Sequence, residues 1–275
     1  MSKIQFTEMK IGPRLANKFL RSNSEDNRKL SNPTVKKYAR DMTMNRWDLT
    51  AEPIMVTQCG TLINGQHRLQ AVVLSGKTVN FTLATVPDSS TFRVLDQGRA
   101  RKNTDILGTS NTVLVPLNMF LRGVLNITAP TAHDLEIARQ TEIGATLFEI
   151  DSLIKPSGKL WRNSGVRAAC AAAIASGVVT KEEAFEAYRT ISRKPIAEWP
   201  PLFVAFYQFV SETPSKQHLS HQRCFANEYF CRAYYCFANV NTSKTKLRIS
   251  AKFMSELREK VTAVVRDAMP SKALA

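Results

Sequence analysis

Hydrophobic positions in the first hundred residues follow a helical period in one segment and a β period in three others. Apolar side chains recur at helical spacing over residues 33–42, which predicts a helix that Pro33 can begin. Short or alternating runs rich in β-branched side chains predict strands over residues 53–57, 61–63 and 78–86. We therefore expect this part of the chain to fold as a small sheet with helices.

Two further helices are expected in the same part of the chain. Residues 14–21 carry a weak helical signal. A stronger signal begins near Gly65, directly after a predicted strand, and continues through the apolar run 69–74. Gly76 follows this run as the left-handed glycine that commonly ends a helix. The resulting order of strand, turn, helix and strand puts a glycine at the entrance of the helix.

The hydrophobic pattern becomes almost wholly helical after Pro87. The expected helices cover residues 89–95, 103–107, 113–125, 132–151, 165–176, 181–191, 201–210, 222–238 and 244–269. The small apolar residues 168–175 are typical of a tightly packed, buried helix. The fold class is therefore α+β: a small mixed domain with N-terminal helices at residues 1–107, followed by a larger all-helical domain at residues 108–275.

Composition and charge narrow the class of protein. Of the 275 residues, 44% are hydrophobic, which is enough for a core and excludes dominant disorder. Neither a membrane-spanning stretch nor the apolar core of a signal peptide is found, so we expect a cytoplasmic protein without a membrane partner. The 38 Lys and Arg residues exceed the 23 Asp and Glu residues, giving a net charge of +15. This balance favours a polyanionic partner, with nucleic acid ahead of an acidic membrane.

Cysteine usage agrees with an intracellular protein. Five cysteines are an odd number, which argues against a secreted disulfide scaffold. Cys59 and Cys170 are interpreted as small core residues. The spacing of His218, His221 and Cys224 winds around a helix, so no metal site is expected from them.

Basic side chains that fall together along the chain are the candidate DNA contacts. They lie on the polar face of the 33–42 helix, after the third predicted strand, and in a run at residues 218–260 where basic and aromatic residues interleave. The alternatives are a solvated helix face for the first group and an aromatic core stripe for the last. The DNA-binding candidates are Lys36, Lys37, Arg40, Lys102, Lys244, Lys246 and Arg248.

The segment from Asn64 to Arg68 has the chemistry of an anion site. Gly65 permits close backbone approach, and the start of a helix offers unpaired N–H groups and a partial positive charge. His67 and Arg68 in the first turn oppose the helix dipole unless an anion lies opposite them. Alternatively, His67 or Arg68 pairs with a carboxylate such as Glu52 or Asp96.

A second basic cluster follows the third predicted strand. Arg99, Arg101 and Lys102 surround Gly98 just before a predicted helix. Arginine side chains beside a glycine turn are a further phosphate-type arrangement. The alternative is a solvated basic loop.

The sequence of residues 64–68, Asn-Gly-Gln-His-Arg, resembles the (D/N)GQHR signature of the ParB/sulfiredoxin superfamily. Residues 94–105 are similar to the D-x-G-R-x-R segment that follows this signature, and the resemblance covers about residues 30–108. It implies a small α+β scaffold that binds nucleotides or DNA, as in ParB-like domain proteins of phages and mobile elements. Residues that would contact a triphosphate or a DNA phosphate are Gly65, Gln66, His67 and Arg68, with Arg99 and Arg101 as a second contact.

The superfamily includes CTP-hydrolysing DNA clamps, ATP-using sulfiredoxins, free-serine kinases and reported nucleases, and this sequence departs from several of them. Asn64 stands where many relatives have Asp and cannot act as a general base, which lowers a kinase or nuclease interpretation. No cysteine occupies residues 61–76, which disfavours sulfinic acid chemistry. No helix-turn-helix is recognisable in the helical half.

Three hypotheses follow. The first is a DNA-binding protein with a nucleotide or phosphate pocket at residues 64–68. The second is an enzyme using an NTP with Mg²⁺ at the same pocket, a phosphotransferase, NTPase or metal-dependent nuclease, with His67 as base or phosphate stabiliser and Asp96, Asp105 or Glu52 as acid. The third is a non-catalytic inhibitor of a host nucleic-acid machine. The sequence does not show which nucleotide would bind or whether the protein assembles into a homo-oligomer.

Overall fold

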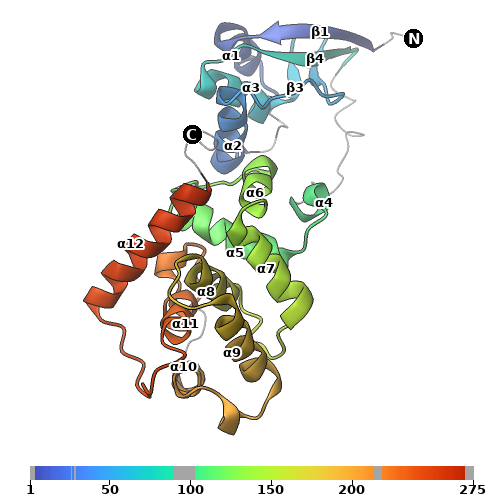
Figure 1. Ribbon diagram of the computed structural model, residues 1–275. Helices are drawn as coiled ribbons and strands as arrows, with labels where there is room; N and C mark the ends of the chain where they lie inside the picture. The colour runs from blue at the N-terminus through green and yellow to red at the C-terminus, as the bar shows by residue number, and fades with distance from the viewer. Residues whose placement is uncertain (1–3, 26, 28, 89–102, 214–218, 270–275) are drawn as a thin grey trace. The chain divides into compact units, whose positions relative to one another are not determined.

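The computed structural model describes residues 4–25, 27, 29–88, 103–213 and 219–269 (Figure 1). The chain forms two compact units, Met1–Ala100 and Arg101–Ala275. The first unit contains a four-stranded sheet and the second is built of helices, so the fold is mixed α+β. The predicted boundary lies a few residues later, after residue 107. The difference arises because α4 (Asn103–Leu107) packs against α6 (Ala132–Arg139) in the second unit.

The sheet of the first unit has the order β1-β4-β2-β3. The three predicted strands are present as β2 (Ile54–Thr57), β3 (Leu62–Asn64) and β4 (Val79–Val86). β2 pairs antiparallel with β3 and parallel with β4. The parallel pair requires a crossover connection, which β3 and the helix after it supply.

β1 (Gln5–Ile11) is a strand that the hydrophobic pattern does not predict. It pairs antiparallel with β4 at one edge of the sheet. Its only buried residue is Ile11, and five of the other six are exposed. An edge strand held by its hydrogen-bond ladder needs little apolar surface of its own, which explains the weak signal.

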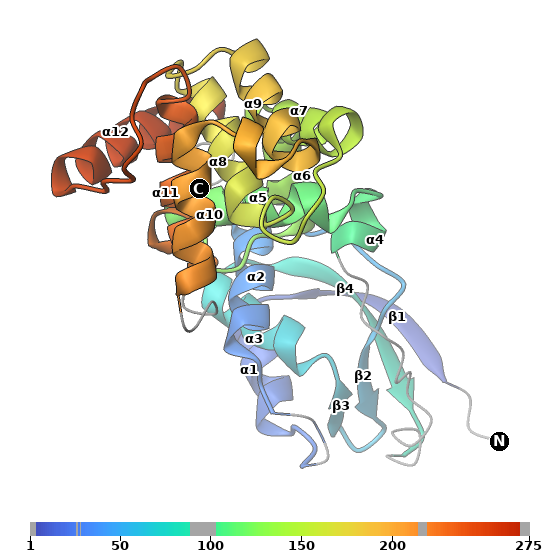
Figure 2. The ribbon, with the colours of Figure 1, turned by 90° about the horizontal axis from the view of Figure 1, so that it is seen from below.

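Three helices cover one face of this sheet: α1 (Pro13–Arg21), α2 (Asn32–Thr43) and α3 (Gln66–Ser75) (Figure 2). The predicted stripe of α2 is buried at Val35, Ala39 and Met42. Leu69 and Val72 of α3 and alternate residues of β4 complete the core of the first unit. Gly76 has the predicted left-handed conformation, with φ of 69°, and its N–H donates to the Val72 carbonyl.

The second unit is arranged around α8 (Ser164–Ala175). Ala168 to Ala173 are all fully buried, as the small apolar run predicts. The helix packs against most of the others in the unit, which the small size of its side chains permits. These neighbours are α5 (Asn111–Gly123), α7 (Glu142–Glu149), α9 (Lys181–Arg193), α11 (Glu228–Ala238) and α12 (Ala251–Ala268). α10 (Pro201–Glu212) packs against α11.

Three of the helices predicted in the second unit are shorter or divided in the structure. The segment 132–151 contains α6 and α7, because the Thr141 hydroxyl accepts from the Gly144 N–H and caps a new helix. A π-helical turn, Ile150–Ile154, follows α7. In the segment 222–238, Asn227 caps α11 after a 3₁₀ turn, Cys224–Ala226. The segment 244–269 becomes helical only after Ser250, which caps α12.

The interpretation of Cys59 and Cys170 as core residues is correct for one of the two. Cys170 is fully buried, but Cys59 is exposed in the turn between β2 and β3. Its thiol lies 3.1 Å from the Thr57 hydroxyl, and this hydrogen bond holds the pKa of the thiol below its usual value. Among the described residues, no helix has the length and apolar character needed to cross a membrane.

Candidate functional site

The turn at Asn64 and Gly65 joins β3 to α3. Gly65 is the N-cap of the helix and has φ of 106°, in the region that favours glycine. A Cβ atom built on Gly65 would lie 2.4 Å from Cδ1 of Ile54 and 3.4 Å from its Cα. The close approach predicted at Gly65 is therefore made by strand β2, and it explains the glycine without a ligand.

Arg68 is buried beneath this turn. Its two terminal nitrogens donate to the main-chain carbonyl oxygens of Glu52 at 2.6 Å and Pro53 at 2.8 Å. Burial lowers the pKa of the guanidinium, and the nearby Glu52 carboxylate acts in the opposite direction. The alternative prediction named a carboxylate partner, such as Glu52; the groups that accept hydrogen bonds from Arg68 are instead the main-chain carbonyl oxygens of residues 52 and 53. These two hydrogen bonds tie α3 to the segment that leads into β2.

The other side chains of residues 64–68 also have partners within the first unit. Gln66 is buried, and its Oε1 accepts a hydrogen bond from Asn23 at 3.3 Å. Nε2 of His67 accepts from the Ser31 main-chain N–H at 2.9 Å. Asn64 is exposed, with its amide nitrogen 4.0 Å from the Met55 sulfur.

These contacts change which groups are available at the turn. Because Nε2 of His67 already accepts a hydrogen bond, this nitrogen is not available as a general base in this arrangement. The first turn of α3 has no side-chain cap hydrogen bond, since its N-cap residue is Gly65. The second predicted phosphate cluster cannot be placed beside it, since Asp96, Arg99, Arg101 and Lys102, and the side chain of Asp105, lie outside the described residues.

The three basic candidates of α2 differ in exposure. Lys36 is exposed, whereas Lys37 and Arg40 are half-buried. Burial lowers the pKa of the Arg40 guanidinium, which Asp41 partly offsets. The polar face of α2 is therefore a mixed surface, in which Lys36 is the most exposed of the three cations.

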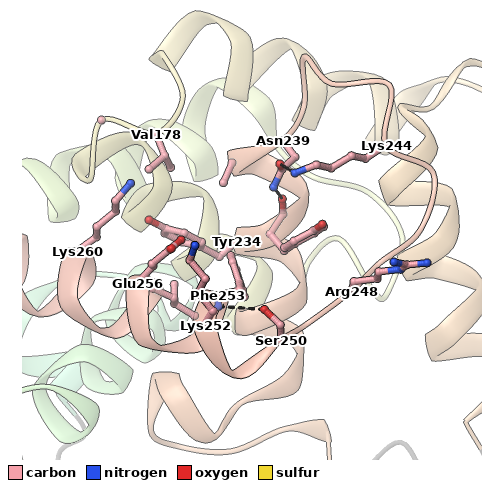
Figure 3. Close-up of a pocket in the computed structure, with 14 residues that line it drawn as sticks. Val178, Tyr234, Asn239, Lys244, Arg248, Ser250, Lys252, Phe253, Glu256 and Lys260 are labelled. Atoms are coloured by element: carbon pink, nitrogen blue, oxygen red, sulfur yellow. Dashed lines mark hydrogen bonds between the residues drawn. The ribbon is translucent and has the colours of Figure 1, made fainter.

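Lys244, Lys246 and Arg248 lie in the irregular segment that connects α11 to α12. Lys244 and Arg248 line a hollow of about 700 Å³, which we call the α11–α12 hollow. Its walls come from α11, the connecting segment, the first turns of α12 and the turn at Gly177 and Val178 (Figure 3). Lys246 is exposed but does not line the hollow.

Positive charge dominates the α11–α12 hollow. Besides Lys244 and Arg248, its described lining includes Lys252 and Lys260 of α12, against one carboxylate, Glu256. None of these four cations forms an ion pair within 4.0 Å with a described carboxylate. The hollow is therefore a site at which a bound anion would meet uncompensated positive charge.

Lys244 is held in position by neutral groups. Its Nζ donates to Oδ1 of Asn239 at 2.6 Å and lies 5.6 Å from the centre of the Tyr235 ring. The Asn239 amide nitrogen in turn donates to the Tyr235 carbonyl at 2.8 Å. These contacts orient the ammonium group and leave its full charge in place.

Lys252, Glu256 and Lys260 were not among the predicted site residues. They recur every four residues, which places them on one face of a helix. Lys252 and Lys260 belong to the basic and aromatic run at residues 218–260, but the sequence does not show that the connecting segment and α12 line one hollow with α11. The sequence feature that could have indicated this site is the four-residue spacing of Lys252, Glu256 and Lys260, together with a helix that begins after Ser250.

The described residues contain no group of three or more His, Cys, Asp or Glu side chains that could hold a metal ion. His218 lies outside them, so its predicted spacing to His221 and Cys224 cannot be placed. A comparison with models of known protein families gives no match, and comparisons with curated proteins and with solved structures give no significant match either. The ParB-like resemblance accordingly depends on the motif residues alone.

Proposed function

We propose that this protein binds nucleic acid, with DNA as the expected polymer, through the cationic side chains around the α11–α12 hollow. The observation that carries the proposal is the set of four cations, without ion-pair partners among the described carboxylates, at a single concave site. A net charge of +15 adds a long-range attraction toward a polyanion. The ParB-like resemblance of residues 64–68 favours the same class of partner.

The other hypotheses have less support among the described residues. A nucleotide or phosphate at residues 64–68 stays a prediction, since Gln66, His67 and Arg68 all make hydrogen bonds within the first unit. The enzyme interpretation needs an acid beside His67; of its three candidates, Asp96 and the side chain of Asp105 lie outside the described residues, and Glu52 is exposed. The proposal is therefore restricted to binding.

The test compares two charge reversals in one segment. Lys244→Glu and Lys246→Glu change the net charge equally, but only Lys244 lines the hollow. We expect Lys244→Glu to weaken DNA binding by about tenfold more than Lys246→Glu, because a phosphate contact is replaced by repulsion. The measurement is fluorescence anisotropy on the full chain with a DNA of mixed sequence, as a single strand and as a duplex, over a series of salt concentrations.

The salt series provides a second measurement, the dependence of affinity on salt concentration. Each phosphate contact that is lost should reduce the slope of log K against log salt by about 0.7–0.9. A smaller slope for Lys244→Glu with an unchanged slope for Lys246→Glu supports the proposal. Equal effects of the two variants, or an affinity that does not depend on salt, would overturn it.

A further inference from the structure

We propose that the α11–α12 hollow binds single-stranded nucleic acid in preference to duplex, holding the strand by its phosphates without reading its bases. The inference rests on the proposed function and narrows its ligand. It follows from the shape of the hollow, from the N-terminus of α12 that borders it and from the burial of its aromatic side chains.

The hollow is concave and of small-ligand size. Its volume of about 700 Å³ lies within the range of pockets that enclose one compact ligand. Lys252 and Lys260 on α12 face it from one side, and Lys244 and Arg248 on the connecting segment line it from the other (Figure 3). An unpaired strand can bend a nucleotide into such a site, whereas the phosphates of a duplex are held on a stiff rod.

The N-terminus of α12 opens into the same hollow. Ser250 lines the hollow and caps the helix, its hydroxyl accepting from the Phe253 N–H at 3.1 Å. The first turn carries Lys252 and no acidic residue, so a cation is added to the positive end of an 18-residue helix. An anion in the hollow would be attracted by both the lysine and the helix end.

The tyrosines of the hollow do not offer a free ring face to a base. Tyr234 is 2% exposed and Tyr235 is 8% exposed. Tyr235 is covered by the Lys244 ammonium and by the Phe253 ring, whose centre lies 4.9 Å away in an edge-to-face arrangement. Phe253, the other aromatic side chain of the hollow, is half-buried, and its ring packs against both tyrosines. Because base stacking requires an accessible aromatic face, recognition depends mainly on the phosphates.

Glu256 provides a test of the electrostatic part of the inference. It is exposed and is the one carboxylate among the described residues that line the hollow. If phosphates occupy the hollow, Glu256→Gln removes a repulsion and strengthens binding. Glu259 lies on the same helix, is exposed and does not line the hollow, so Glu259→Gln is the matched control.

The experiment uses the full chain and three ligands of equal length: oligo(dT), oligo(dA) and a mixed-sequence duplex. By fluorescence anisotropy at one salt concentration, we expect both single strands to bind about tenfold more tightly than the duplex, as a flexible backbone allows. The two single strands should agree within about threefold, because stacking does not contribute. Glu256→Gln should strengthen single-strand binding by about threefold more than Glu259→Gln.

The outcomes separate this inference from the proposed function. Equal affinity for single strand and duplex, with the effect of Lys244→Glu intact, overturns the inference and leaves the proposed function standing. Clearly tighter binding of oligo(dA), whose bases stack more strongly, than of oligo(dT) also overturns it, because the bases would then contribute to binding. If the protein binds neither single-stranded DNA nor duplex DNA, both the inference and the proposed function are wrong.

Discussion

Two main-chain carbonyl groups, those of Glu52 and Pro53, receive their hydrogen bonds from the buried side chain of Arg68. A cation in the first turn of a helix opposes the helix dipole, and the sequence alone suggested either an anionic ligand or an internal carboxylate as the compensation. In the structure, carbonyl dipoles of the neighbouring segment provide it. The planar guanidinium suits this task because its donors are arranged in a fixed fork.

We expect Arg68→Met to lower the free energy of unfolding by about 1–3 kcal/mol, since methionine replaces only the apolar stem of the side chain and leaves both carbonyl groups without their donor. Arg68→Lys should also destabilise the protein, because an ammonium group does not reproduce the fork. The measurement is the midpoint of urea unfolding. Asn64→Ala, an exposed change in the same motif, is the control and should have little effect.

A different result would assign Arg68 another role. If Arg68→Met leaves the midpoint of unfolding unchanged, its hydrogen bonds to residues 52 and 53 contribute nothing to stability. The anion-site interpretation of Arg68 would then regain support.

At the level of elements, the junction between β3 and α3 is constrained both in backbone conformation and in space. Gly65 has a positive φ and lies against Ile54 of β2, so the helix starts where the strand beneath it leaves no room for a side chain. Gly76 at the other end of α3 has a positive φ of 69°, but nothing lies within 4 Å of its Cβ position. The two ends of α3 therefore require glycine for partly different reasons.

We expect Gly65→Ala to destabilise the protein by about 1–3 kcal/mol, from backbone strain and the contact with Ile54. Gly76→Ala has the strain alone and should cost less, about 1 kcal/mol. Chemical unfolding of both variants tests this order. Ile54→Val removes the Cδ1 atom and should partly rescue Gly65→Ala; a reversed order of the two glycine variants would show that the contact is not limiting.

For the molecule as a whole, the main feature is that the chain has two separate hydrophobic cores. The core of the first unit joins its sheet to α1, α2 and α3, and the core of the second unit surrounds α8. Phe237 is fully buried in the second core, with the rings of Tyr188 and Phe203 centred 5.6 and 5.1 Å away. Damage to one core is therefore expected to remain in its own unit.

Phe237→Leu should lower the stability of the second unit by about 1–3 kcal/mol through lost packing and an internal gap. Hydrogen exchange followed by mass spectrometry should show faster exchange in α8 and α11 and unchanged protection in α3 and β4. Faster exchange of similar size in both units would mean that they unfold as one.

Local elements of this protein follow from its amino-acid sequence wherever one face carries a clear pattern. The stripe of α2, the alternation of β4 and the glycine that ends α3 lead directly to the observed elements, because hydrophobic periodicity and backbone preference are properties of the local sequence. The hydrophobic pattern does not predict β1, because the strand is stabilised by a partner strand whose residues lie 68 to 80 positions later in the chain. Thr141, Asn227 and Ser250 divided or shortened predicted helices through caps that the periodicity alone does not show.

Long-range packing, in contrast, settles which charged groups are used internally and which remain available. Residues 64–68 looked like a ligand site because every group in them can bind an anion, yet Arg68 contacts carbonyl oxygens contributed by a distant segment. The cations of the α11–α12 hollow are spread over the segment 244–260, and they converge because the connecting segment and α12 line one hollow together with α11. Hydrogen-bond partners and convergent charge depend on contacts between segments, which a single sequence does not specify.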